Sequence, residues 1–356
     1  MSRLVALAMP GGPEFVAALQ RTWDAGDAAF PLDPRLPKAV GERLMREVRV
    51  GEPVEPGDAL VVATSGSTGE PKGVVLTHDA VRASAGATSA RLAVDPLSDR
   101  WLACLPLSHV GGLAVVTRAL VTGTPLTVHP GFDPEAVMIS GATLTALVAT
   151  ALRRVDPAAF RLIVLGGARP PADRPPNVVA TYGMTETGSG VVYDGVPLDG
   201  VDVRIVDGEI HVRGPMLLRC YRDGTDPKTA AGWLPTGDLG ELDDEGRLVV
   251  HGRRGDLIIS GGEKVWPEPV EDVLRGLPGV ADAAVAGVDD EEWGQRVVGW
   301  IVPADAGAPP SLQEVRAAAR DHLPPYALPR QLVVVATLPR TGLGKVRRDA
   351  LISLLA

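Results

Sequence analysis

The chain has 356 residues, a formal net charge of −9 and 45% hydrophobic residues. This length is too great for one ordinary hydrophobic core, so we expect two domains. The acidic balance, with basic residues dispersed along the chain, argues against a nucleic-acid partner. The two cysteines, Cys104 and Cys220, suggest no disulfide framework and favour a reduced, cytoplasmic setting. The sequence contains no apolar stretch of membrane-spanning length. The apolar run near residue 1 is shorter than a signal peptide requires, so we do not expect secretion.

Short apolar runs predict strands through the first two thirds of the chain. Several are near-continuous Val, Leu and Ile, which is typical of strands buried on both faces. The predicted strands are 59–66, 73–78, 100–109, 124–129, 161–167 and 177–183. Between them, 79–94 and 133–155 are predicted to be largely helical. This alternation indicates an α/β body with a mostly parallel sheet.

A change of pattern follows this body. Residues 201–214 alternate apolar and polar side chains about Asp207-Gly208, which predicts a hairpin, and a second turn is expected within 243–253. The remaining predicted elements are a helix at 268–277, strands at 280–288 and 295–303, a helix at 311–323 and a strand at 330–339. We therefore predict a small second domain, with the joint near residues 253–256.

One stretch, TSGSTGEPKGV at 64–74, combines Gly, Ser and Thr with a single lysine. Glycines let the backbone approach an anion, hydroxyl and N–H groups donate hydrogen bonds, and Lys72 adds positive charge. Composition alone favours an ordinary surface turn over a triphosphate loop. The stretch is not a Walker A loop, because Pro71 precedes the lysine and Gly73 follows it. A P-loop kinase or ATPase is therefore disfavoured.

The complete string resembles the phosphate loop of the adenylate-forming enzymes, the superfamily of acyl-CoA synthetases, peptide-synthetase adenylation domains and firefly luciferase. Four further motifs follow in the family's order: TYGMTETG at 181–188, PTGDLGELDDEGRLVVHGR at 235–253, GRRGDLIISGGEKVWPEPVE at 252–271 and LPRTGLGKVRRD at 338–349. The resemblance implies an α/β adenylate-forming fold. It divides the chain into an N-terminal adenylation domain at 1–254 and a small mobile C-terminal α+β domain at 255–356.

The resemblance implies a reaction in two halves. A carboxylate first attacks the α-phosphate of ATP, giving acyl-AMP and pyrophosphate, and a thiol, usually that of CoA, then displaces AMP. Lys345 would bridge the carboxylate and the α-phosphate, and it would be withdrawn for the second half when the C-terminal domain swings. Glu186 would hold Mg²⁺, a cation that prefers oxygen ligands, and Thr68 would assist it.

Other positions are assigned by the same motifs. Tyr182 would stack on adenine, and Asp238 would accept both ribose hydroxyls with Arg253 in support. The residues that the resemblance assigns to ATP are Thr64, Ser65, Gly66, Ser67, Thr68, Gly69, Lys72, Gly167, Ala168, Tyr182, Gly183, Met184, Thr185, Asp238 and Arg253. Those assigned to CoA are Ser260, Gly261, Gly262 and Lys264. The hinge would be Gly255-Asp256, although many members carry Asp or Lys where Gly255 stands.

The acyl substrate is indicated by His109, Gly167 and Arg118. His109 matches a position that lines the family's acyl pocket. Arg118 lies in the apolar run LAVVTRALV, where an arginine is costly unless it is paired, and a guanidinium can grip a carboxylate through two bonds. The pattern HVGGLAVVTR is similar to that of o-succinylbenzoate–CoA ligases of menaquinone synthesis, in which this arginine faces the substrate's second carboxylate. Only about 60 residues precede the phosphate loop, so the N-terminal region is reduced relative to typical members.

The sequence leaves alternatives open. A CoA ligase for another aryl or small carboxylic acid fits the same motifs, as does an adenylating enzyme that loads a carrier protein. A nucleotide-binding module without catalysis is a further alternative, although Lys72, Glu186, Asp238, Arg253 and Lys345 are all present. The expected partners are the acid, ATP and CoA, and a homodimer is left open. The sequence decides neither the exact acid nor the oligomeric state.

Overall fold

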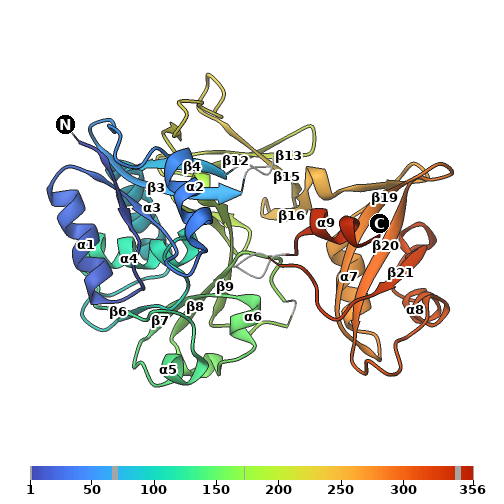
Figure 1. The fold of residues 1–356 in the computed structure, drawn as a ribbon. Helices are drawn as coiled ribbons and strands as arrows, with labels where there is room; N and C mark the ends of the chain where they lie inside the picture. Colours follow the sequence, from blue (N-terminus) through green and yellow to red (C-terminus); the bar gives the residue numbers. More distant parts are fainter. Residues whose placement is uncertain (1, 66–70, 172, 341–345, 356) are drawn as a thin grey trace. The chain divides into compact units, whose positions relative to one another are not determined.

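The structure is a computed structural model, which describes residues 2–65, 71–171, 173–340 and 346–355 (Figure 1). The chain forms two compact units that are interleaved in sequence. The N-terminal unit comprises Met1–Arg204, His211–Pro235 and Leu242–Leu248. The C-terminal unit comprises Ile205–Ile210, Thr236–Glu241 and Val249–Ala356. The division between 254 and 255 that the motifs imply stays a prediction.

Two sheets form the framework of the N-terminal unit. The first has the order β1-β2-β3-β4-β14, with β1 to β3 parallel and the remaining pairs antiparallel. Its strands are β1 (Leu4–Leu7), β2 (Ala28–Pro31), β3 (Asp58–Ser65), β4 (Pro71–Thr77) and β14 (Cys220–Tyr221). Helix α1 (Pro13–Asp24) packs on β1 and β2, and α2 (Lys38–Glu47) adds Leu44 and Met45 to the apolar cluster of this sheet.

The second sheet has the order β11-β10-β9-β8-β7-β5-β6. Its strands are β5 (Trp101–Ala103), β6 (Leu126–Val128), β7 (Leu144–Val148), β8 (Leu162–Gly166), β9 (Val178–Met184), β10 (Ser189–Tyr193) and β11 (Val196–Pro197). The five strands from β9 to β6 are mutually parallel. Strand β10 pairs antiparallel with β9, and β11 pairs antiparallel with β10. The prediction of a mostly parallel sheet is therefore confirmed here.

Two helices form a layer between these sheets. Helix α3 (His78–Arg91) packs on β3 and β4, α4 (Val110–Thr122) packs on β5 and β7, and the helices pack on each other. Helix α4 ends at Gly123, whose φ of 69° gives the left-handed turn that commonly terminates helices. Its central residues are apolar and buried, so it carries Arg118 into the interior.

The predicted helix over 133–155 is wrong at its centre. Leu144–Val148 is β7, an inner strand, while only Pro134–Met138 (α5) and Ala149–Leu152 (α6) are helical. A short apolar run that is buried on both faces has the same pattern in a strand and in a buried helix. The predicted strand over 100–109 also shrinks to Trp101–Ala103, because a turn and the start of α4 follow it.

A third sheet has the order β12-β13-β15-β16. Its strands are β12 (Asp202–Val206), β13 (Glu209–Arg213), β15 (Leu234–Leu242) and β16 (Leu248–Arg253). The predicted hairpin at Asp207-Gly208 is confirmed, since both residues have positive φ, 49° and 77°, as a two-residue hairpin turn requires. The predicted second turn forms where the Asp243 carboxylate accepts the Arg247 N–H at 2.8 Å.

The C-terminal unit contains a sheet with helices on it. Its strands are β17 (Ile258–Ser260), β18 (Glu263–Val265), β19 (Val280–Asp290), β20 (Gly294–Pro303) and β21 (Gln331–Val334). Helices α7 (Pro267–Arg275) and α8 (Leu312–Ala319) share one apolar cluster with β19 and β20. Helix α9 (Arg348–Ile352) shares a separate cluster that contains Trp300. Each element predicted in this tail is present, but the strand predicted over 330–339 is confined to β21 and the helix predicted over 311–323 is confined to α8.

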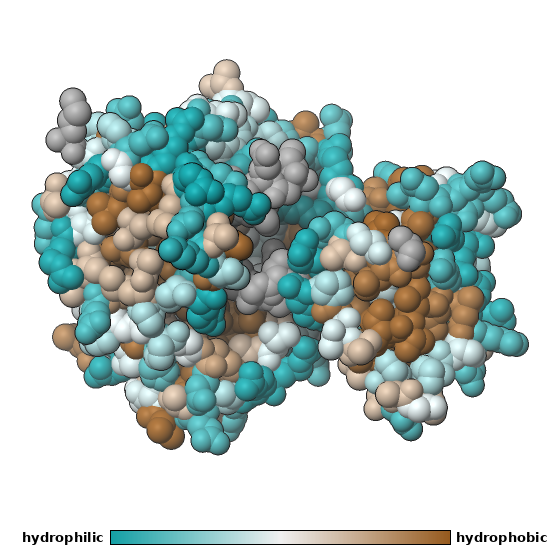
Figure 2. All heavy atoms as spheres, viewed as in Figure 1, coloured by the Kyte–Doolittle hydropathy of each residue, from teal (hydrophilic) through white to brown (hydrophobic). Residues whose placement is uncertain are grey.

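The surface of the C-terminal unit is apolar in places. Figure 2 shows hydrophobic residues gathered on one of its faces, and its exposed apolar side chains include Val334, Ile352 and Leu354.

Among the described residues, none of the helices combines the length and the apolar character that crossing a bilayer requires.

Two adjacent glycines in the first turn of α4 have different surroundings, and comparing substitutions at them tests the packing of this turn. A Cβ at Gly112 would lie 2.6 Å from the carbonyl oxygens of both Leu105 and Pro106, whereas at Gly111 the nearest atom would be 3.9 Å away. We expect Gly112→Ala to destabilise the protein by about 1–3 kcal/mol, because backbone atoms must move. Gly111→Ala should be neutral or stabilising by up to about 1 kcal/mol. Equal unfolding temperatures for the two variants would contradict this packing.

Candidate active site

The two ends of the proposed phosphate loop lie on paired strands. Thr64 of β3 pairs with Lys72 of β4, and Ser65 pairs with Pro71. Residues 66–69, which include the predicted Gly66, Ser67, Thr68 and Gly69, lie outside the described residues. The hairpin therefore fixes the base of the loop and the strand that carries Lys72.

Lys72 and Glu186 are brought together by a residue that the sequence analysis missed. Tyr221 of β14 donates its hydroxyl hydrogen to Glu186 Oε1 at 3.0 Å, and Lys72 Nζ lies 4.8 Å from the centroid of the same ring. Tyr221 pairs with Val74, two residues after Lys72 on β4, so the register brings the ring beside the lysine. A cation and a carboxylate thus both contact one tyrosine, and all three residues are half-buried.

The position of Glu186 follows from the turn after β9. A Cβ at Gly183 would lie 2.2 Å from the carbonyl oxygen of Ser189, so only glycine fits between β9 and β10. The hydroxyl of Thr187 accepts the N–H of Met184 at 2.9 Å and closes the short turn Thr185–Thr187. The predicted Tyr182, Gly183 and Met184 therefore lie on β9, and Thr185 and Glu186 lie in the turn that follows.

The carboxylate of Glu186 suits Mg²⁺. Its Oε1 is held by Tyr221, and its Oε2 accepts no hydrogen bond from the described residues. No group of three or more His, Cys, Asp or Glu side chains in the described part of the chain could hold a metal. Mg²⁺ typically binds through one or two carboxylates together with substrate phosphates and water, so a single carboxylate beside a phosphate loop fits it.

His109 immediately precedes α4 and is half-buried. Burial lowers the pKa of its imidazole, and this effect outweighs the nearby carboxylate of Asp33, which acts in the opposite direction; Arg35 lowers the pKa further. The side chain is therefore neutral at neutral pH. A neutral ring is compatible with lining a pocket for an aromatic acid.

Arg118 is a buried cation without a carboxylate partner among the described residues. Its side chain is 2% exposed, and burial lowers the pKa of its guanidinium. Nη2 donates to Ser189 Oγ at 3.3 Å, and the guanidinium carbon lies 4.9 Å from the centroid of Trp101. Nε and Nη1 have no hydrogen-bond partner in the described structure. A buried charge with unused donors is unfavourable unless an anion joins it.

The two residues predicted to hold ribose are in contact. Asp238 of β15 is 8% exposed, and its Oδ1 lies 2.9 Å from Arg253 Nε. Arg253 Nη1 also donates to the carbonyl of Thr236 at 2.7 Å. The N–H of Gly237, a residue with φ of 74°, donates to Glu209 Oε1 at 2.8 Å. These bonds fix the orientation of Asp238.

The segment predicted to meet CoA is a tight hairpin. Gly261 and Gly262 have φ of 62° and 85° and join β17 to β18. Ser260 is buried and Lys264 is exposed. A Cβ at Gly261 would lie 2.9 Å from the Trp293 ring, so glycine is needed at this position.

The remaining predicted residues are placed as follows. Gly167, with φ of 87°, directly follows β8, and Ala168 after it is exposed. Gly255 and Asp256 lie in a short helical turn, Arg254–Asp256. Lys345 lies outside the described residues.

Comparison with known proteins agrees with these motifs. The family model for AMP-binding enzymes matches residues 38–222, and the model for the C-terminal domain of AMP-binding enzymes matches residues 269–345. The chain belongs to the AMP-binding enzyme family.

Several similar proteins carry the name of one activity. A probable 2-succinylbenzoate–CoA ligase of Mycobacterium tuberculosis is 42% identical, over 98% of this chain and 97% of its own length. A 2-succinylbenzoate–CoA ligase of Bacillus cytotoxicus is 36% identical, over 83% of this chain and 70% of its own length. The o-succinylbenzoate CoA synthetase of Bacillus subtilis, solved with its acyl-adenylate intermediate, superposes with a TM-score of 0.87 at 29% identity, covering 98% of this chain and 88% of that one.

The burial of His109 predicts a pH effect on stability. Because its folded pKa is lowered, the unfolded chain binds the proton first as the pH falls below about 6.5, so stability decreases with falling pH. His109→Asn removes this proton uptake. We expect its unfolding temperature to fall less than that of the wild type between about pH 7.5 and about pH 5.5. His78, whose pKa is also lowered by burial, remains in both proteins, and parallel profiles would contradict the prediction.

Proposed function

We propose that this chain is a 2-succinylbenzoate–CoA ligase, which converts o-succinylbenzoate, ATP and CoA into o-succinylbenzoyl-CoA, AMP and pyrophosphate in menaquinone synthesis. The observation that carries the proposal is the buried Arg118, whose Nε and Nη1 have no partner in the described structure. The names of similar enzymes and the adenylate-bound structure of one of them support the same substrate.

The substrate has two carboxylates, only one of which reacts. The second needs a positively charged receptor, and a guanidinium offers parallel N–H donors that match a carboxylate. In Arg118, Nε and Nη1 have no partner in the described structure, while the guanidinium contacts the Trp101 ring and Nη2 donates to Ser189. Binding would give the buried cation its counter-charge, so part of its desolvation cost would be recovered. Benzoate and fatty acids lack the group that would do this.

Each residue that the motifs assign to ATP would have its own role. Lys72 would contribute charge to the phosphates, and Glu186, oriented by Tyr221, would hold Mg²⁺. When bound, the metal would neutralise phosphate charge during adenylation. Asp238, oriented by Arg253, would accept the ribose hydroxyls.

The two half-reactions would be divided between segments of the C-terminal unit. Lys345 would stabilise charge as the carboxylate attacks the α-phosphate. The Ser260–Lys264 hairpin would lie along CoA in the second half-reaction. A cytoplasmic location and a homodimer stay predictions.

Arg118→Met tests the carboxylate receptor. We expect the KM for o-succinylbenzoate in pyrophosphate release to rise roughly 10- to 100-fold, because charge-assisted hydrogen bonds are lost, with little change in the KM for ATP. Without ligand, the unfolding temperature should stay the same or rise, since an uncompensated buried charge is removed.

Arg82→Met, on the exposed face of α3, is the matched control and should match the wild type. Among the residues that the structure describes, the side chain of Arg82 bonds to Asp79 alone. An unchanged KM for o-succinylbenzoate in Arg118→Met would remove the proposed receptor. A large drop in its unfolding temperature would instead give Arg118 a structural role.

Lys345→Ala tests the proposed mechanism. We expect acyl-AMP formation to fall by at least about 100-fold, because a charge that acts only in the adenylation transition state is lost. Thioester formation from supplied acyl-AMP and CoA should largely survive. The two half-reactions are measured separately on one preparation, and equal losses in both would refute the assignment.

A further inference from the structure

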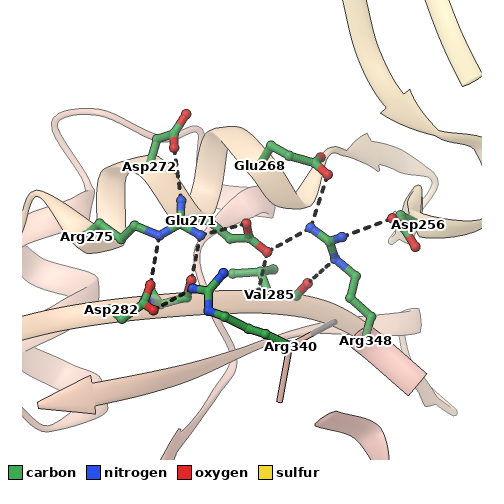
Figure 3. Close-up of polar contacts among 10 residues, drawn as sticks. Asp256, Glu268, Glu271, Asp272, Arg275, Asp282, Val285, Arg340 and Arg348 are labelled. Atoms are coloured by element: carbon green, nitrogen blue, oxygen red, sulfur yellow. Dashed lines mark hydrogen bonds and ion pairs between the residues drawn. The ribbon is translucent and has the colours of Figure 1, made fainter. Parts of the chain in front are cut away.

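One guanidinium in the C-terminal unit connects three separate elements (Figure 3). Arg348, the first residue of α9, donates from Nη1 to Asp256 Oδ2 at 3.0 Å and from Nε to the carbonyl of Val285 at 3.0 Å. Nη2 donates to Glu268 at 3.1 Å and to Glu271 at 2.8 Å. Its side chain is 17% exposed, so these bonds form largely away from solvent.

The same network reaches the other side of the segment that contains Lys345. Glu271 also binds Arg275, whose Nε lies 3.2 Å from Asp282, and Asp282 in turn binds Arg340. Arg340 and Val346 form a backbone bridge, and the Arg347 N–H donates to the carbonyl of Pro339 at 2.9 Å. The described residues on both sides of 341–345 are therefore fixed to each other and to α7 and β19.

The network also fixes the residue after Gly255. Asp256 is bound by Arg348, while Arg254 on the other side of Gly255 binds Glu209 at 2.9 Å. A Cβ at Gly255 would meet no heavy atom within 4 Å. Anchored residues thus bracket one unobstructed glycine, the position at which the family resemblance places the hinge.

We propose that Arg348 is a positioning residue for adenylation. It binds the chain three residues after Lys345 to the Asp256 turn, and so keeps the segment that carries the lysine at a fixed position relative to the hinge. The role of Arg348 rests on the proposed role of Lys345.

The fold can tolerate the loss of this guanidinium. Glu271 keeps Arg275 and the N–H of Val285, which donates to it at 2.9 Å. Glu268 has one oxygen that is buried without a partner in the described structure, and burial raises the pKa of its carboxyl group. This group can therefore take up a proton when Arg348 is removed, so that no unpaired charge remains there.

The test is the ratio of the two half-reactions in Arg348→Met. We expect acyl-AMP formation from o-succinylbenzoate to fall roughly 10- to 100-fold, because a displaced catalytic group costs about that much. Thioester formation from supplied acyl-AMP should stay within about twofold of the wild type. The ratio is independent of the fraction of protein that is folded, because both rates come from one preparation.

Matched variants sharpen this measurement. Arg347→Met is the control, because the Arg347 side chain is 53% exposed and its one ion pair within the described part of the chain is with Asp349. Its ratio should equal that of the wild type. Arg348→Lys keeps the positive charge but lacks the planar set of N–H donors of the guanidinium. It should recover part of the adenylation rate that Arg348→Met loses. In Arg348→Met, adding Asp256→Asn should cause little further loss, since the two residues act through one bond.

Equal loss in both half-reactions, or the same ratio change in Arg347→Met, would make Arg348 a structural residue and overturn the proposal. Lys345→Ala and the wild type are measured alongside. If Lys345→Ala loses adenylation selectively and Arg348→Met does not, only the role of Arg348 fails. If the wild type forms no acyl-AMP from o-succinylbenzoate, the proposed function fails, and the role of Arg348, which rests on it, fails as well.

Discussion

The burial of Arg118 is the constraint on which the account of the N-terminal unit depends. Arg118 is 2% exposed and lacks a carboxylate partner among the described residues, so the packing around it must offset the cost of burying its charge. Helix α4, packed on β5 and β7 and against α3, supplies that packing. Gly112 lies close to the backbone that precedes the helix, so a larger residue there would displace the first turn of the helix that carries Arg118.

The two units use arginine in opposite ways. In the C-terminal unit, Arg348 and Arg275 each bind several carboxylate or carbonyl oxygens, so their charges are compensated within the fold. Such pairing rigidifies a segment but leaves little for a ligand. Arg118 keeps two nitrogens without partners in the described structure, which is the condition expected of a receptor for an anion.

The sequence carries the motifs more clearly than the packing. Contiguous motifs predict Glu186, Asp238 and Arg253 as site residues because each lies in a string with few other interpretations, and these roles stay predictions. The structure places Asp238 and Arg253 in direct contact. Tyr221 was not found, since it belongs to a two-residue strand and meets Glu186 only through the register of β14 on β4. Strand β7 was mistaken for helix, because a short run buried on both faces carries no periodicity. Long-range pairing, which decides both cases, leaves no local signal.

The most direct measurement is pyrophosphate release by the wild-type protein with ATP, Mg²⁺ and CoA, in the presence of o-succinylbenzoate, benzoate, a medium-chain fatty acid or no acid. The account predicts release with o-succinylbenzoate alone, together with the appearance of its CoA thioester. Release with benzoate at a comparable kcat/KM would contradict it, because that acid has no second carboxylate for Arg118 to bind.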